Sequence, residues 1–565
     1  MSVRCALLCG IAALLLLTFS WRYESPSAAP RVTAEAREGI LRLALSRGHD
    51  VLGSARAAQQ RRRRRYMGAS TSGAPSLVEA VENGGEEGAA AMAVRPPPPA
   101  AAAVVASGAA AAASPVPLAA IARTLLSIDF HISPIQDLKH LLKSSFPGVT
   151  VADRSLSGAC LRTGTCATDD NLKVLVRGDV DNSMYFGISR RQEFFEAYRE
   201  GGTGGRLVLD SDAMVCSHPT GMCELAMPFN RSVILWATTR FEQGRERNRG
   251  RLEGYIKNFR ALAALPGSVV LANNMYDVHY IHYFTGVLPR YVPSQCAYPG
   301  VQWSWRKGGT GEERTILVHG YRPKGVMVNS MALPPGVDPQ FHPPMGVNDF
   351  LSPLNALADS GRTGGFRFRE LRDALGNNYQ YAKLASFPAI LHLPYQVSIM
   401  SFFEHYRMGV PIIAPSLALL TKWHMDNLFV SERTWDTVLY GKPSTSSVLP
   451  RHPDADEPFD PNDEKNPAAV EWWLQWADYY TFPHIITFDS WEDLASKVAA
   501  ADLGAISAAM LQHGKVLEEQ LVGTWADVLR GIPKHEERAA DALLAGLPFG
   551  QRMDRIYGAG NWAAY

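Results

Sequence analysis

The sequence has almost no net charge, few cysteines and few sites for N-glycosylation. Its 56 Lys and Arg side chains balance 55 Asp and Glu, so the net charge of +1 gives no reason to expect a nucleic-acid surface. None of its seven cysteines stands in a CxxC pair with zinc spacing. The only Asn-x-Ser/Thr sequon begins at Asn230, which we predict to be glycosylated if it enters the secretory pathway.

Residues 24–120 are poor in aromatics and rich in Ala, Pro, Gly and Arg. They include five consecutive arginines at 61–65 and a Pro-rich run that begins at Arg95. Such a composition cannot bury enough apolar surface to order itself, so we predict a disordered stem. The arginine run also suits a nucleic-acid or lipid patch, but a solvated stretch or a processing site explains it more simply.

Residues 1–23 indicate the cellular compartment that the protein enters. Arg4 precedes about seventeen largely apolar residues, from Cys5 to Trp21, and Arg22 follows. This length lies between that of a signal-peptide core and that of a short membrane span, and the cationic N-terminus favours keeping that end in the cytoplasm. We expect residues 1–23 to be a type II signal anchor that places the body in the Golgi or ER lumen. Signal cleavage and secretion is the alternative.

Four cysteines stand in two close pairs, which suits an oxidising lumen. Short-loop disulfides Cys160–Cys166 and Cys216–Cys223 are the expected arrangement, with Cys296 left over. Buried free thiols remain the alternative for all of them.

Beyond residue 121, strand-like apolar runs alternate with helical patterns, which is typical of parallel α/β sheets. We expect an α/β fold of two Rossmann-like domains facing across a cleft, at 121–310 and 311–535, with a peripheral tail at 536–565. The expected strands are 171–178, 213–217, 232–239 and 268–274, then 314–325, 389–394 and 484–488.

Ligands of such sheets bind beyond the carboxyl ends of the strands, near helix N-termini. His218 follows one predicted strand and is our candidate catalytic residue. Arg240 and Glu242 follow the next strand and are candidates for the acceptor side. His279 and His282 share a helix face, but no third ligand is evident, so we predict no metal ion there.

One stretch carries a family resemblance. Glu404, Gly409 and Pro411 have the spacing E-x4-G-x-P, which resembles a block of the GT-B glycosyltransferases. In a retaining subset of that family a Glu stands eight residues earlier, where this chain has Gln396. Three further segments resemble the family in the same order, namely 212–219, 272–294 and 314–325.

The resemblance implies a glycosyltransferase that moves a sugar from a nucleotide-sugar donor to a glycan, protein or lipid acceptor, without a cofactor. It implies that Glu404 accepts hydrogen bonds from the donor ribose and that Arg322 and Lys324 meet the diphosphate. Gln396 and Ser398 are further residues that we expect to bind the nucleotide-sugar donor. Because Gln396 replaces a carboxylate, retention and inversion both stay open.

Three alternatives stay open. Glu404 suits an ion pair with Arg407 on one helix face. A GT-A transferase would hold Mn²⁺ through an Asp-x-Asp triplet. The triplets are Asp179 with Asp181 and Asp210 with Asp212. A non-catalytic lumenal binding protein on a GT-B scaffold would explain the glutamine at 396.

Overall fold

A computed structural model describes most of the chain beyond residue 117. The described residues are 118–157, 160–161, 163–167, 172, 174–175, 188–199, 202–245, 248–306, 314–319, 347–376, 378–434, 444–537 and 544–565. The predicted anchor, the stem up to residue 117, Arg322, Lys324 and the triplet Asp179–Asp181 lie outside them.

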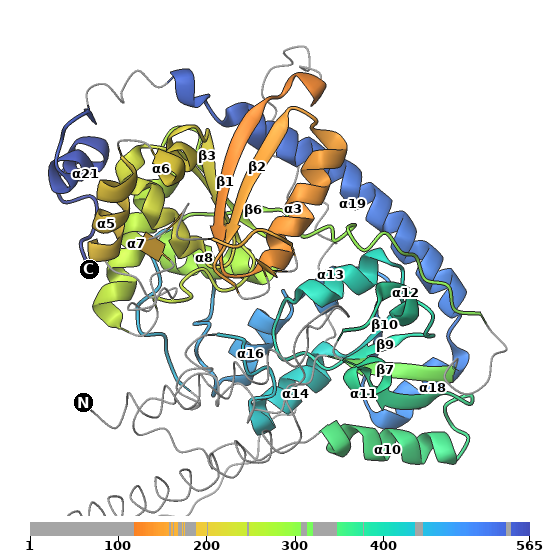
Figure 1. Cartoon of the computed structure of the whole chain (residues 1–565). Helices are drawn as coiled ribbons and strands as arrows, with labels where there is room; N and C mark the ends of the chain where they lie inside the picture. The colour runs from red at the N-terminus through yellow and green to blue at the C-terminus, as the bar shows by residue number, and fades with distance from the viewer. Residues whose placement is uncertain are drawn as a thin grey trace, which may run out of the picture. The chain divides into compact units, whose positions relative to one another are not determined.

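A parallel sheet forms the first half (Figure 1). Its strand order is β2-β1-β3-β4-β5-β6, and every pair is parallel. The strands are β1 (Arg123–Asp129), β2 (Val149–Ser155), β3 (Ala213–Cys216), β4 (Ser232–Ala237), β5 (Val269–Ala272) and β6 (Arg290–Tyr291). Every residue of β3 and β4 is buried, as expected for central strands covered on both faces.

The helices of this half pack on that sheet and carry side-chain caps. Asn248 and Asn274 accept hydrogen bonds from backbone N–H groups in the first turns of α7 and α8. The elements are η2 (Leu118–Ala120), α3 (Ile132–Ser145), α5 (Ile188–Tyr198), α6 (Gly202–Leu209), η4 (Thr220–Phe229), α7 (Arg249–Ala263) and α8 (Met275–Thr285).

A second parallel sheet forms the other half, in the order β11-β10-β9-β7-β8. The strands are β7 (Thr315–His319), β8 (Arg367–Glu370), β9 (Ile390–His392), β10 (Ile412–Pro415) and β11 (Ile486–Phe488). The helices that follow β7 in the chain are α10 (Val347–Asp359), α11 (Leu371–Leu375), α12 (Tyr381–Leu384), α13 (Met400–Arg407), α14 (Leu417–Asn427), α16 (Pro467–Leu474), α17 (Asp478–Thr481), α18 (Trp491–Ala500), α19 (Leu503–Gly531), η7 (His535–Glu537) and α21 (Phe549–Tyr557). Two all-parallel α/β halves, predicted from the apolar runs, are therefore confirmed.

Gly409 and Pro411 have structural roles between α13 and β10. Gly409 has a φ of +74°, and an added Cβ would lie 2.7 Å from Leu511 Cγ. The carbonyl of Pro411 accepts the backbone N–H of Ile390 at 2.9 Å, which starts the pairing of β10 with β9. The family-like block is thus a helix stop followed by a strand.

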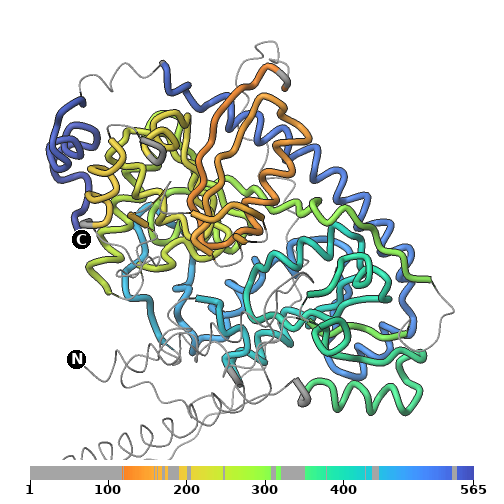
Figure 2. Tube along the Cα trace, in the orientation of Figure 1, coloured from red at the N-terminus to blue at the C-terminus, as the bar shows by residue number. Residues whose placement is uncertain are grey.

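The chain returns to the first half after the second sheet. The C-terminal part of α19 packs into the core of the first half, where the Trp525 ring lies 5.8 Å from that of Trp236. Figure 2 follows this long blue segment from the second half to the orange strands of the first. Residue 535 therefore does not end a domain confined to the second sheet.

The predicted peripheral tail is wrong for its described part, 544–565. The Tyr565 hydroxyl donates to the buried Glu224 carboxylate at 2.6 Å, and Tyr557 donates to the Met227 carbonyl at 3.1 Å. Phe549 and Met553 of α21 are buried. The aromatic-rich end of the chain completes the core of the first half.

One predicted strand is also wrong where it is described, because Leu172, Val174 and Leu175 are helical. A short apolar run does not distinguish a buried strand from a buried helix. In the part of the chain that the structure describes, no single helix is long and apolar enough to cross a membrane, and only α18 with α19, bent by 88°, satisfies length and composition.

Candidate functional site

Each sheet has a point where the direction of strand addition reverses. In the first sheet β2 lies on one side of β1 and β3 on the other, and in the second β8 and β9 flank β7 in the same way. Such switch points open a crevice beyond the carboxyl ends of the strands. The edges after β1 and β3, and after β7 and β9, are therefore where ligand-binding residues are expected.

Asp129 is the last residue of β1, and its carboxylate connects the segments that follow β1 and β3 at the first switch point. Its Oδ2 accepts the Ser217 hydroxyl at 2.6 Å, the Ser217 N–H at 3.2 Å and the His218 N–H at 3.0 Å. Its Oδ1 accepts the His131 N–H at 2.8 Å. The carboxyl group thus fixes the backbone at the ends of both strands.

His218 lies at this edge with a half-buried side chain. Its ring centroid is 5.0 Å from that of His131. Burial lowers the pKa of His218 well below its usual value, and the charges of His131 and Arg240 lower it further. The imidazole is therefore neutral at pH 7 and able to accept a proton.

Asp129 makes stability depend on pH. Burial raises its pKa from 3.8 to about 7, although hydrogen bonds, that of Ser217 first, oppose the rise. The stability that the protonated form contributes is therefore fully present below pH 3.8 and is lost as pH rises to about 7. We expect Asp129→Asn to reduce this loss, as measured by denaturant unfolding of the full-length chain between pH 4 and pH 8. An unchanged pH profile in Asp129→Asn would contradict this account.

The acceptor-side candidates after β4 have internal partners. Arg240 pairs with Asp277 of α8 through two hydrogen bonds of 2.6 and 2.8 Å. Glu242 accepts the Tyr280 hydroxyl at 2.7 Å. Arg240 also donates to the Arg433 carbonyl at 3.3 Å, which connects this edge to the second half. An acceptor role for Arg240 and Glu242 stays a prediction beside these structural contacts.

Asp478 lies where the two halves meet and was missed by sequence reasoning. It is fully buried, and burial raises its pKa well above the usual value. The charge of Asp277 raises that pKa too, whereas the Ser398 hydroxyl and Arg240 lower it. Ser398, predicted on the donor side, is thus buried beside an acidic group that faces both halves.

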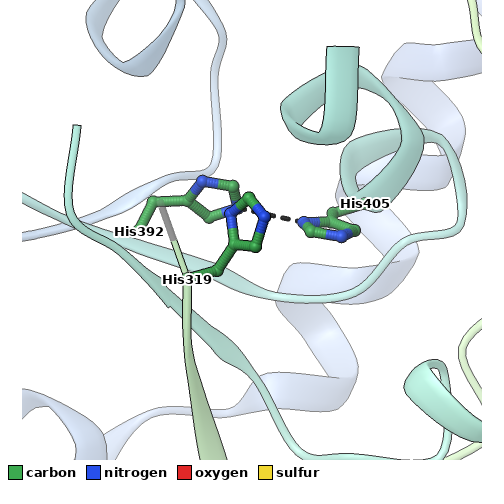
Figure 3. A group of neighbouring side chains, drawn as sticks. All are labelled: His319, His392 and His405. Carbon is green, nitrogen blue, oxygen red and sulfur yellow. Dashed lines mark hydrogen bonds between the residues drawn. The ribbon is translucent and has the colours of Figure 1, made fainter. Parts of the chain in front are cut away.

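Histidines gather at the second switch point. His319 ends β7, His392 ends β9, and the two residues are register partners. His405 reaches them from α13, and its Nδ1 lies 3.0 Å from His392 Nε2 (Figure 3). Sequence analysis did not single out these residues because they are distant in the chain and follow no motif.

Glu404 is buried on α13, one turn beyond the helix start. Its carboxylate accepts hydrogen bonds from the hydroxyls of Tyr298 and Tyr381. Burial raises the pKa of Glu404, and the tyrosine hydrogen bonds partly offset that rise. Arg407 pairs with Glu518 of α19, so the alternative in which Glu404 pairs with Arg407 is wrong.

Gln396 donates a hydrogen bond to Glu432. The Glu432 N–H in turn donates to the Tyr395 carbonyl at 2.9 Å. The position that lacks the family carboxylate therefore has a carboxylate next to it, supplied from the loop after α14. No local sequence signal identifies Glu432, since it comes from 36 residues away.

The described Asp-x-Asp triplet does not suit a metal-dependent site. The residues before Asp210 form α6 rather than a strand. Asp212 precedes β3, at the amino end of the sheet, where it accepts the N–H groups of Thr124 and His535, each at 2.7 Å. Asp212 therefore links β1 and the segment at His535 at the edge opposite the switch point.

The remaining sequence-predicted features lie in different parts of the described chain. The structure contains the disulfides Cys160–Cys166 and Cys216–Cys223, the second directly before Ser217. Asn230 of the sequon is half-buried after η4. His279 and His282 contact Glu457 through their Nδ1 atoms, at 3.3 and 2.9 Å.

No protein-family model and no curated protein matches the chain. Among solved structures, it is similar to the glycosyltransferase VinC in complex with DTDP, at 12% identity over 72% of this chain and 99% of that chain, with a TM-score of 0.33. It is also similar to the glycosyltransferase SnogD from Streptomyces nogalater, at 14% identity over 72% of this chain and 99% of that chain, with a TM-score of 0.33. A third similar structure is CalG4, the calicheamicin glycosyltransferase, at 12% identity over 74% of this chain and 99% of that chain, with a TM-score of 0.31. Because these scores are low, the description of the fold rests on the two sheets themselves.

Proposed function

We propose that the chain is a glycosyltransferase that moves a sugar from a nucleotide-sugar donor to a glycan, protein or lipid acceptor in the secretory pathway. The observation that carries the proposal is the meeting of two independent parallel sheets at their carboxyl edges, through Arg240 and the Arg433 carbonyl. Each edge is a switch point, so one ligand is received by each half.

The donor diphosphate is assigned to the start of α13, beyond β9. Its N-cap residue, Ile399, makes no side-chain capping hydrogen bond, and the Phe402 N–H donates to the Ile399 carbonyl, which leaves the N–H groups of Met400 and Ser401 to receive an anion. The family resemblance implies a role for Arg322 and Lys324 toward the same diphosphate, although both lie outside the described residues. The helix dipole of α13 favours an anion at its start.

Glu404 is proposed to accept hydrogen bonds from the donor ribose. A carboxylate has about four lone-pair positions, and the hydroxyls of Tyr298 and Tyr381 each use one. The tyrosines hold the carboxylate in place while acceptor capacity remains. Gln396 and Glu432 supply a polar pair close to the same helix start.

His218 is proposed to act as the general base. As the acceptor hydroxyl oxygen bonds to the anomeric carbon of the sugar, its proton passes to the imidazole and the nucleoside diphosphate departs with the bonding electrons. Asp129 positions the His218 backbone rather than its ring, so its role is indirect. The type II anchor at 1–23 and the stem would hold this body in the Golgi or ER lumen.

A screen of the purified full-length chain against a panel of sugar nucleotides tests the proposal. We expect at least one donor to bind and to release its nucleotide when acceptors are added. Binding without turnover under all acceptors would favour the non-catalytic binding protein. Turnover that requires Mn²⁺ and is lost in Asp179→Asn would favour the GT-A alternative.

A further inference from the structure

Three imidazoles converge at the second switch point, from three separate elements. His319 comes from β7, His392 from β9 and His405 from α13 (Figure 3). One nitrogen from each ring lies within 4.8 Å of those of the other two. His392 and His405 are fully buried and His319 is half-buried.

We infer that His319, His392 and His405 bind a Zn²⁺ ion. Neutral imidazole is a preferred zinc ligand, and three histidines leave a fourth position for water or another oxygen ligand. With Zn–N bonds of about 2.0–2.1 Å, tetrahedral geometry separates ligand nitrogens by roughly 3.3 Å. The His392–His405 nitrogens are 3.0 Å apart, within a few tenths of an ångström of that value, and the His319 nitrogen lies within 4.8 Å of both.

Aromatic rings surround the buried part of the cluster. Phe402 and Tyr479 pack against the His392 ring, with centroids 6.1 and 5.8 Å away. The half-buried His319 gives the side from which an ion enters.

The two fully buried rings face each other through one nitrogen each, His392 Nε2 and His405 Nδ1. These facing nitrogens are the atoms that an ion between the rings would contact. This inference does not depend on the proposed glycosyl transfer.

A second group of possible ligands serves as the matched control. His282, Asp456 and Glu457 also lie close together, but the Asp456 side chain is 93% exposed. An exposed carboxylate offers weaker ion binding than three converging imidazoles. His282→Ala is therefore the control variant for a change at the histidine cluster.

The test is the zinc content of the purified full-length chain after equilibration with ZnSO₄ and removal of free ion, by elemental mass spectrometry. We expect one tightly held Zn²⁺ in the wild type and in His282→Ala. We expect at least a 100-fold weaker affinity in His319→Ala and His392→Ala, since even second-shell changes cost about 10–100-fold. Co²⁺ in place of Zn²⁺ should give the visible absorption of a tetrahedral site.

His319→Ala keeps the test decisive if His392→Ala fails to fold, because His319 is the least buried of the three. A wild-type chain that binds no zinc would overturn the inference. So would zinc retained in a folded His319→Ala chain, or zinc lost in His282→Ala. Zinc should also raise the melting temperature of the wild type but not of His319→Ala.

Discussion

Replacing His218 with alanine is expected to lower sugar-nucleotide turnover by about 10²- to 10⁴-fold, the usual contribution of a general base. The side chain is neutral because burial lowers its pKa, and it lies at the edge after β3 where the acceptor is assigned. His218→Gln keeps polar contacts without a basic nitrogen and should lose nearly as much. The measurement is released nucleotide at saturating donor.

The control for this prediction is His140→Ala, since His140 is exposed on α3. Its turnover should equal that of the wild type. Turnover should also fall as pH drops through the pKa of His218, because the protonated imidazole cannot accept the acceptor proton. Unchanged turnover in a folded His218→Ala chain would remove His218 from the mechanism.

Replacing Glu224 with glutamine is expected to destabilise the fold by about 3–5 kcal/mol, the cost of breaking a buried ion pair. Its carboxylate accepts Arg191 Nη1 at 2.9 Å, Arg245 Nε at 3.0 Å and Asn258 Nδ2 at 2.7 Å. Without that charge, two buried guanidinium groups lose their counter-ion. The Tyr565 contact would weaken too, loosening the end of the chain.

Glu253→Gln is the matched control, because Glu253 pairs with Arg249 on the exposed face of α7 at 2.9 Å. Exposed pairs of this kind contribute only about 0.3–0.5 kcal/mol. The melting temperature should therefore fall by on the order of 10 °C in Glu224→Gln and hardly move in Glu253→Gln. Equal shifts in the two variants would show that the buried network is not what stabilises this half.

Much of the fold could be predicted because the central strands are continuous apolar runs. The runs at 213–217, 232–239 and 268–274 contain β3, β4 and β5. In the second half, the runs at 314–325, 389–394 and 484–488 contain β7, β9 and β11. β1 and β2 were both missed, β2 because its residues Val149–Ser155 mix polar and apolar side chains. The run at 171–178 was misread because burial alone does not set helix or strand.

The site was harder to predict because strand order brings its residues together. Asp129 and Ser217 are 88 positions apart and meet only because β1 and β3 are neighbours. His319 and His392 meet through β7 and β9 in the same way. His218 could be found because it directly follows a predicted strand, whereas Asp478 gave no local signal.

The central claim is that α13 presents a donor site at the edge of the second sheet, and Glu404→Gln tests it most directly. The substitution keeps the shape of the side chain but removes a charge-assisted hydrogen bond, typically about 1.5–3 kcal/mol. At about 1.4 kcal/mol per tenfold, donor affinity or turnover should fall roughly 10- to 150-fold.

Arg407→Ala, which removes only the pair with Glu518, should retain wild-type turnover. The measurement is donor binding and nucleotide release for the wild type and both variants, each checked for its melting temperature. A loss of turnover confined to Glu404→Gln, without matching loss of stability, is the result that we predict. Unchanged binding and turnover in a folded Glu404→Gln chain would contradict the donor site and the glycosyltransferase proposal with it.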